Sequence, residues 1–133
     1  EGNALGNLGN AYYSLSEARR AIAYYEQQLE ITREIGYRRG EGNAIGGLGL
    51  AYVDLGEVRR AIEYYDQQLA IAREIGDRRE EGNALANMGL VYQQLEDPDR
   101  ARGLWQQALA LYEAIEDPNA SRVREWLDGL PPL

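Results

Sequence analysis

Amide and guanidinium side chains recur at helical spacing along this sequence. Arg79, Asn83 and Asn87 are each four residues apart, and Arg39 stands four residues before Asn43. In a helix, residues at this spacing share one face. An asparagine amide can pair with both the N–H and the C=O of one peptide unit, and an arginine can hold a carboxylate through two parallel hydrogen bonds. The pattern favours a surface that binds an extended peptide.

The composition excludes most catalytic chemistry. All 14 basic residues are arginine, and the sequence contains no lysine, histidine or cysteine. It therefore cannot supply a thiolate nucleophile, an imidazole base or metal ligand, or a Schiff-base lysine. The carboxylates Glu30 and Glu34 are four residues apart, but they fall on a polar helix face where no pocket is implied. We expect a chain that is not an enzyme and that uses no cofactor or metal.

The charge and the hydrophobicity restrict the partners. The 133 residues carry 14 basic and 22 acidic side chains, a formal net charge of −8. Because phosphate binding needs a basic surface, we expect no nucleic-acid partner. No run approaches the ~20 apolar residues of a membrane span, and no signal segment opens the chain. These features predict a cytoplasmic protein without a membrane partner. Since the chain starts with Glu1 inside a repeat, we expect a piece of a longer protein. Arginine without lysine would suit a GC-rich bacterial genome.

The sequence repeats itself every 40 residues. Residues 1–40 and 41–80 are identical at 27 of 40 positions, and residues 81–120 match the second copy at 15 of 40. Periods of this length are typical of solenoids, in which each unit buries its apolar face by stacking on its neighbours. Residues 121–133 break the pattern, and we expect a capping helix at about 118–128. The apolar stripe of Val123, Trp126 and Leu127 would seal the last repeat.

Each repeat predicts two helices joined by a turn. The apolar residues in both halves of a repeat recur at helical spacing, as in Leu5, Leu8, Tyr12 and Leu15, then Ala21, Tyr25, Leu29 and Ile35. Gly56 and Gly76 can take the left-handed conformation that ends a helix. Asp77 with Glu80, and the Asp-Pro pairs at 97–98 and 117–118, are typical helix starts.

Glycines inside the first helix of each repeat could be mistaken for a phosphate-binding loop. The stretches GNALGNLG (residues 2–9) and GNAIGGLG (residues 42–49) lie within a helix, however, and do not follow a strand. Each interior glycine costs roughly 1 kcal/mol relative to alanine. We therefore expect close helix packing at Gly9, Gly49 and Gly89 rather than nucleotide binding.

The repeat resembles the tetratricopeptide repeat (TPR). The signature residues are the run from Leu8 through Gly9 to Tyr12, followed by Ala21, Tyr25 and Leu29, and they recur as Leu48, Gly49, Tyr52, Ala61, Tyr65 and Leu69, then as Met88, Gly89, Tyr92, Ala101, Trp105 and Leu109. Three features depart from the family. The 40-residue unit exceeds the usual length of about 34, Leu5, Ile45 and Leu85 replace an aromatic, and Gln28 and Gln68 replace a small residue.

The resemblance implies a fold and a function. The fold would be an all-α, right-handed α-solenoid of three antiparallel helical hairpins plus a C-terminal capping helix, in a single domain over residues 1–133. The function would be a non-catalytic protein–protein interaction module that binds a peptide or partner segment in its concave groove. The side chains that the resemblance and the spacing place on that surface are Asn3, Asn7, Asn10, Tyr13, Arg39, Asn43, Leu50, Arg79, Asn83, Asn87 and Leu90.

A second function stays open. Extended repeats of this kind are similar to those of Pins-type spindle-orientation scaffolds and of arrays in large bacterial signalling proteins. Leu5, Leu8 and Tyr12 have no preceding repeat to cover them, so the chain could self-associate through this edge or act as an autoinhibitory or sensor scaffold. The chaperone-tail clamp of some relatives is disfavoured, because Gly6, Asn83 and Asn87 stand where that clamp has Lys or Arg.

Overall fold

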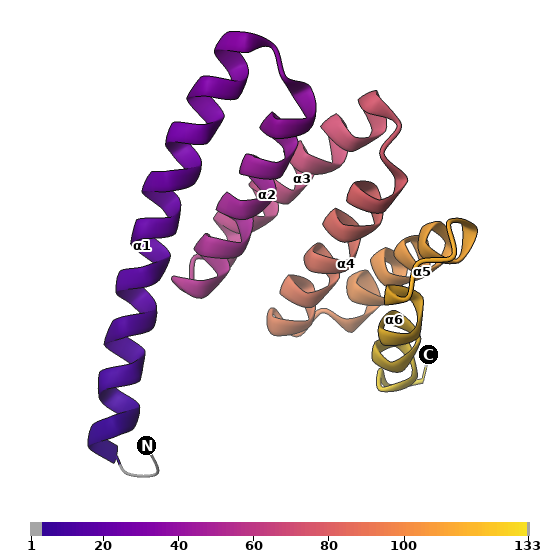
Figure 1. The fold of residues 1–133 in the computed structure, drawn as a ribbon. Helices are drawn as coiled ribbons and strands as arrows, with labels where there is room; N and C mark the ends of the chain where they lie inside the picture. Colours follow the sequence, from indigo (N-terminus) through magenta and orange to yellow (C-terminus); the bar gives the residue numbers. More distant parts are fainter. Residues whose placement is uncertain (1–3, 133) are drawn as a thin grey trace. The chain divides into compact units, whose positions relative to one another are not determined.

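The described chain consists of helices without strands (Figure 1). The computed structural model describes the backbone of residues 4–132 and the side chains of residues 14–132. The helices are α1 (Ala4–Ile35), α2 (Arg38–Asp54), α3 (Val58–Ile75), α4 (Arg78–Gln94), α5 (Pro98–Ala114) and α6 (Asn119–Asp128). The chain divides into two compact units, Glu1–Tyr64 and Tyr65–Leu133, with the boundary inside α3. No described helix is long and apolar enough to cross a membrane.

Left-handed residues end the helices at intervals of 20 residues. They are Gly36, Gly56, Gly76, Glu96 and Glu116, with φ of 72°, 84°, 73°, 60° and 55°. At each turn the next residue donates its N–H to a carbonyl five positions back, at 2.8–2.9 Å, as from Tyr37 to Thr32. This six-residue closure defines a Schellman motif. The turns predicted at Gly56 and Gly76 are therefore present.

The first repeat does not form the predicted hairpin. Residues 4–35 form one continuous helix, α1, so the described chain has six helices where three hairpins and a cap would give seven. Position 16 is the equivalent of Gly56 and Glu96, but it is a serine. Glycine favours the left-handed turn, and Glu96 is followed by Asp97 and Pro98, which stop a helix. Ser16 is followed by Glu17 and Ala18, so neither stop signal is present and the helix continues.

The predicted helix starts at Asp77, Asp97 and Asp117 are confirmed. The Asp77 carboxylate accepts the Glu80 N–H at 3.1 Å, and that of Asp97 accepts the Arg100 N–H at 3.2 Å, with proline in the first turn of α5. Asp117 accepts the Asn119 N–H at 2.8 Å, and α6 begins at Asn119, one residue later than predicted. Each carboxylate satisfies an N–H that the helix leaves unpaired.

In the first unit, α1 lies antiparallel to α2 (Figure 1). The buried face of α2 includes Ile45 and Leu48, each 1% exposed. Gly47 admits the ring of Tyr25 from α1, where any larger side chain would overlap it. Further along α2, the ring of Tyr52 stacks on that of Tyr64, with centroids 5.4 Å apart and planes 7° apart.

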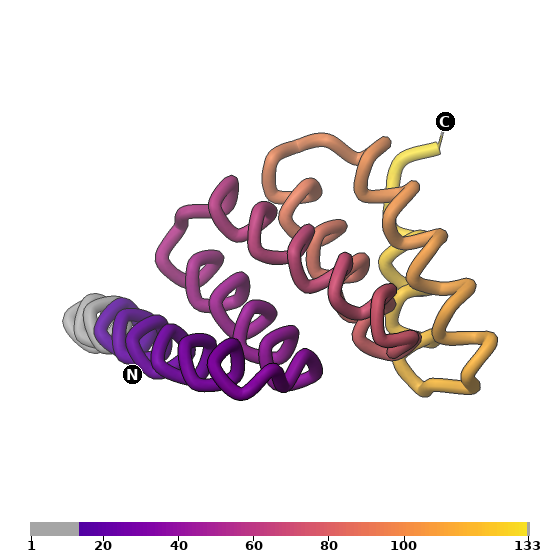
Figure 2. Tube along the Cα trace, turned by 90° about the horizontal axis from the view of Figure 1, so that it is seen from above, coloured from indigo at the N-terminus to yellow at the C-terminus, as the bar shows by residue number. Residues whose placement is uncertain are grey.

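In the second unit, Trp105 is the centre of the core. Its side chain is fully buried, its Nε1–H donates to the Ala86 carbonyl at 3.1 Å, and its ring lies directly on Gly89. The predicted close packing at Gly89 is thus confirmed, whereas the side-chain surroundings of Gly9 lie outside the described residues. Helix α6 lies alongside α5 (Figure 2) and places Trp126 5.3 Å from the Trp105 ring, so the predicted seal is present.

Candidate functional site

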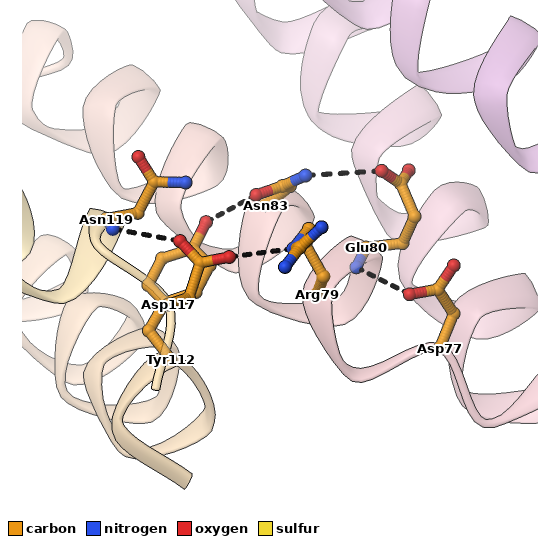
Figure 3. A network of polar contacts seen from close by, with 7 residues as sticks. All are labelled: Asp77, Arg79, Glu80, Asn83, Tyr112, Asp117 and Asn119. Carbon is orange, nitrogen blue, oxygen red and sulfur yellow. Dashed lines mark hydrogen bonds and ion pairs between the residues drawn. The ribbon is translucent and has the colours of Figure 1, made fainter. Parts of the chain in front are cut away.

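Asn83, in the middle of α4, is held by hydrogen bonds within the second unit (Figure 3). Its Nδ2 donates to Glu80 Oε2 at 3.2 Å, and its Oδ1 accepts the Tyr112 hydroxyl at 2.5 Å. Glu80 also accepts a hydrogen bond from Gln68 Nε2 at 2.7 Å. This chain of polar contacts joins α3, α4 and α5. The Asn83 amide is therefore a structural contact as well as a candidate for ligand binding.

The same network explains two unusual residues. Gln68, which departs from the small residue of the TPR pattern, is only 5% exposed and gains a charged partner in Glu80. Burial raises the pKa of Tyr112 to about 12, and the nearby Asp117 and Glu80 carboxylates add to the effect. The Tyr112 phenol therefore stays protonated and donates to Asn83 at neutral pH.

Arg79 forms an ion pair with the start of the capping helix. Its Nε donates to Asp117 Oδ2 at 2.7 Å, and the Asp117 side chain is only 5% exposed, while that of Arg79 is 64% exposed (Figure 3). The backbone N–H of Asn119 and the Arg79 guanidinium both stabilise the charged carboxylate and lower the pKa of Asp117. Arg79 thus fixes the junction of α5 and α6 while much of its guanidinium faces solvent.

Asn87 and Leu90 follow Asn83 on the same face of α4. Both are half-buried, and Asn87 makes no side-chain hydrogen bond to any described residue. Its amide donors and acceptor therefore remain for a ligand or for water. In the second unit, Asn87 and Leu90 form the part of the predicted surface that internal contacts leave open.

In the first unit, α2 carries the predicted residues Arg39, Asn43 and Leu50, and all three are exposed. Leu50 is 54% exposed, although Leu48 two residues earlier is buried. Asn43 has no side-chain hydrogen bond within the described part of the chain. Asn43 and Leu50 are seven residues apart and share one face of α2, as Asn83 and Leu90 do on α4.

The remaining predicted site residues cannot be placed. Asn3 lies outside the described residues, and the side chains of Asn7, Asn10 and Tyr13 lie outside the described side chains. Positions on α2 and α4 belong to different units, so each face stands by itself.

One pair of contacts was not predicted from the sequence. Arg33 Nε contacts Glu41 Oε2 at 3.2 Å, and the equivalent Arg73 Nε contacts Glu81 Oε2 at 3.0 Å. Burial alone would raise the pKa of Glu41, but hydrogen bonds from Arg38 and Arg33 outweigh it and lower that pKa. An Arg eight residues before a Glu, repeated at the 40-residue period, was the available signal. Among the described residues no cluster of three Asp or Glu side chains could hold a metal ion.

The comparisons with known proteins identify the family. The tetratricopeptide repeat model matches residues 1–74 and 41–114, so this chain belongs to the TPR family. TPR repeats generally mediate protein–protein interaction. The curated proteins give no match. Among solved structures, the chain is similar to BtubC (BKLC) from P. vanneervenii, at 20% identity and a TM-score of 0.61, over 94% of this chain and 65% of that one. This likeness confirms the helical-repeat fold, and the chain spans just under two thirds of BtubC.

Proposed function

We propose that this chain is a non-catalytic module that binds extended segments of a partner protein on the exposed face of α2 and on that of α4. The amides of Asn43 and Asn87 would pair with peptide units of the ligand, and Leu50 and Leu90 would contact its apolar side chains. The observation that carries the proposal is Leu50: a leucine 54% exposed beside the unpartnered amide of Asn43. An exposed apolar group next to an open hydrogen-bonding group is typical of peptide-binding surfaces.

Arg39 and Arg79 would contact acidic groups of the ligand. The Arg79 side chain is 64% exposed even while it contacts Asp117, so its guanidinium can hold a second carboxylate. Asn83 would act by holding α4 in place, because both ends of its amide already have internal partners.

The proposal can be tested with peptides selected from a random displayed library against the whole chain. A selected peptide is labelled, and its affinity is measured by fluorescence anisotropy for the unchanged chain and for Asn87→Ala and Leu50→Ala. Each variant should bind about three- to tenfold more weakly, the effect of losing one modest contact. Gln106→Ala, an exposed amide on α5, is the matched control and should bind normally. Unchanged affinity in both Asn87→Ala and Leu50→Ala would contradict the proposal.

A second candidate function is self-association through α1. Tyr24, Ile31 and Ile35 share one stripe of this helix and are 57%, 50% and 68% exposed. The equivalent of Ile31 in the next repeat, Ile71, is 5% exposed. A stripe that later repeats cover and the first leaves open favours association with a further repeat or a second copy. The edge residues predicted from the sequence, Leu5, Leu8 and Tyr12, lie outside the described side chains.

Light scattering across about a hundredfold range of concentration distinguishes the two functions. Self-association predicts a mass that rises with concentration, and Ile31→Glu should abolish the rise. A constant monomer mass would remove this second function and leave peptide binding as the sole proposal.

A further inference from the structure

A cleft in the second unit lies on the opposite side of α4 from Asn83, Asn87 and Leu90. Its volume is about 470 Å³, within the range of ligand sites. The apolar lining comes from three helices and consists of Leu69, Leu85, Met88, Tyr92 and Leu104. The α4 members, residues 85, 88 and 92, fall half a helical turn away from the proposed peptide-binding face. The cleft is therefore a separate surface, and a ligand bound there would be additional to the peptide of the proposed function.

The preceding repeat shows what such a surface can hold. At the positions equivalent to Tyr92 and Leu104, it has Tyr52 and Tyr64, whose rings stack at 5.4 Å. The guanidinium of Arg60 also lies over the Tyr52 ring, 4.6 Å from its centroid. In the second unit the leucine at position 104 leaves the ring of Tyr92 without this aromatic neighbour. The chain thus lacks, at this one place, a ring that it supplies for itself in the repeat before.

Gly103 widens the same opening. It lies inside α5, where glycine weakens a helix relative to alanine, and a Cβ built on it would meet nothing within 4 Å. No internal contact therefore requires a glycine at this position, whose equivalent in the preceding repeat is Glu63. A glycine lining a cleft allows another chain to approach the backbone closely.

Charges at the rim indicate the neighbours of the missing ring. The rim arginines are already neutralised, Arg73 by Glu81 at 3.0 Å and Arg100 by Asp97 at 3.4 Å. Asp66, by contrast, is exposed and has no ion-pair or hydrogen-bond partner among the described residues. The net charge of −8 also attracts a basic partner at long range.

We propose that this cleft binds an aromatic side chain of a partner protein that is flanked by a basic residue. The aromatic ring stacks on Tyr92 as Tyr64 stacks on Tyr52, and the basic side chain pairs with Asp66. Aromatic pairs favour offset or stacked contact beyond the area that they bury.

Three capped tripeptides test this surface: Lys-Tyr-Lys, Lys-Leu-Lys and Glu-Tyr-Glu. Each is titrated into the isotope-labelled chain, and binding is followed by the NMR amide signals of Gly103 and Leu104. Lys-Tyr-Lys should shift both signals saturably, and the other two peptides should bind at least about threefold more weakly. Equal binding by Lys-Leu-Lys, or no saturable shift up to about 10 mM Lys-Tyr-Lys, would overturn the proposal.

Two variants with a matched control complete the test. Leu104→Tyr restores the residue of the preceding repeat, fills the cleft and should weaken Lys-Tyr-Lys by about tenfold or more. Asp66→Asn, a surface change that spares the core, should weaken Lys-Tyr-Lys about two- to fivefold and leave Glu-Tyr-Glu unaffected or improved. Gln106→Ala on the same helix should change nothing. Normal binding by Leu104→Tyr, or by Asp66→Asn if Leu104→Tyr fails to fold, would overturn the assignment.

Discussion

The first and third repeats occupy equivalent stretches of sequence but differ in their turns. Residues 4–35 form the single helix α1, whereas residues 84–115 contain the end of α4, a turn at Glu96 and all of α5. Both stretches have helical apolar spacing. The difference lies at position 16, where serine is followed by no proline, against Glu96 with Pro98 two residues later. Helical periodicity thus sets which faces are buried, while a few turn residues decide where the helix reverses.

The two linkers between repeats differ in a similar way. In the linker after α3, Asp77 caps α4 and Glu80 joins Gln68 to Asn83. In the linker after α1, Tyr37 provides no side-chain cap, and Gly40 stands at the position of Glu80. A Cβ at Gly40 would come within 2.6 Å of the Tyr37 ring. Aromatic contact therefore replaces polar bonding in this linker.

The largest expected effect separates the core of the third repeat from that of the first. Trp105→Ala removes a fully buried ring together with its hydrogen bond to Ala86, and should cost about 3–5 kcal/mol of unfolding free energy. Tyr25→Ala, at the equivalent but half-buried position on the continuous helix, should cost about half as much. Urea unfolding followed by circular dichroism measures both. Equal losses would mean that the first repeat packs like the third.

The next effect concerns the polar linker. Glu80→Ala leaves the buried Gln68 amide without its partner and should cost about 1–3 kcal/mol. Glu81→Ala, the matched control, breaks only an ion pair with the half-exposed Arg73 and should cost at most about 1 kcal/mol. Urea midpoints at a constant slope give both values. A larger loss in Glu81→Ala would show that the ion pair, and not the buried network, holds this linker.

Turn residues should respond in a way that depends on their conformation. Gly56→Ala places a Cβ on a residue with φ of 84° and should cost about 1–2 kcal/mol. Ser16→Gly weakens the interior of a continuous helix and should cost about 0.5 kcal/mol. Thermal unfolding measures both changes. A stabilising Ser16→Gly would contradict the continuous α1, because glycine would then be relieving a left-handed turn.

The smallest effect is a pH dependence at each end of the chain. The folded-state pKa values of Asp117 and Glu41 are lowered, so each carboxylate contributes stability above its unfolded pKa and loses it as pH falls through its folded pKa. Stability should therefore decline as the medium is acidified below the ordinary carboxyl range. Urea unfolding of Asp117→Asn and Glu41→Gln across that range should show a flatter acid limb for each. Curves as steep as that of the unchanged chain would exclude these two groups as its cause.

Most of the fold could be predicted from the sequence because its signals are local and repeated. The 40-residue period, the helical spacing, the glycine turns and the aspartate caps all act within a few residues of one another. The one wrong element, the first hairpin, failed because repeat identity was allowed to outweigh the missing turn signal at Ser16.

The candidate site was less accessible to prediction. Asn83 and Arg79 were expected on the binding surface from their spacing, but their internal partners Tyr112 and Asp117 lie 29 and 38 residues away. No local pattern reports contacts at such separations. The cleft beside Tyr92 was also missed, because it depends on the replacement of one tyrosine by leucine within otherwise equivalent positions.

The most direct test of the proposed function maps a library-selected peptide onto the chain by NMR. Saturating peptide is added to the isotope-labelled chain, and the changed amide and side-chain signals are assigned. The proposal predicts the largest changes at Asn43, Leu50, Asn87 and Leu90, with the Asn43 and Asn87 side-chain amides among them. Changes confined to the α1 stripe of Tyr24, Ile31 and Ile35, with the α2 and α4 faces unaffected, would contradict it.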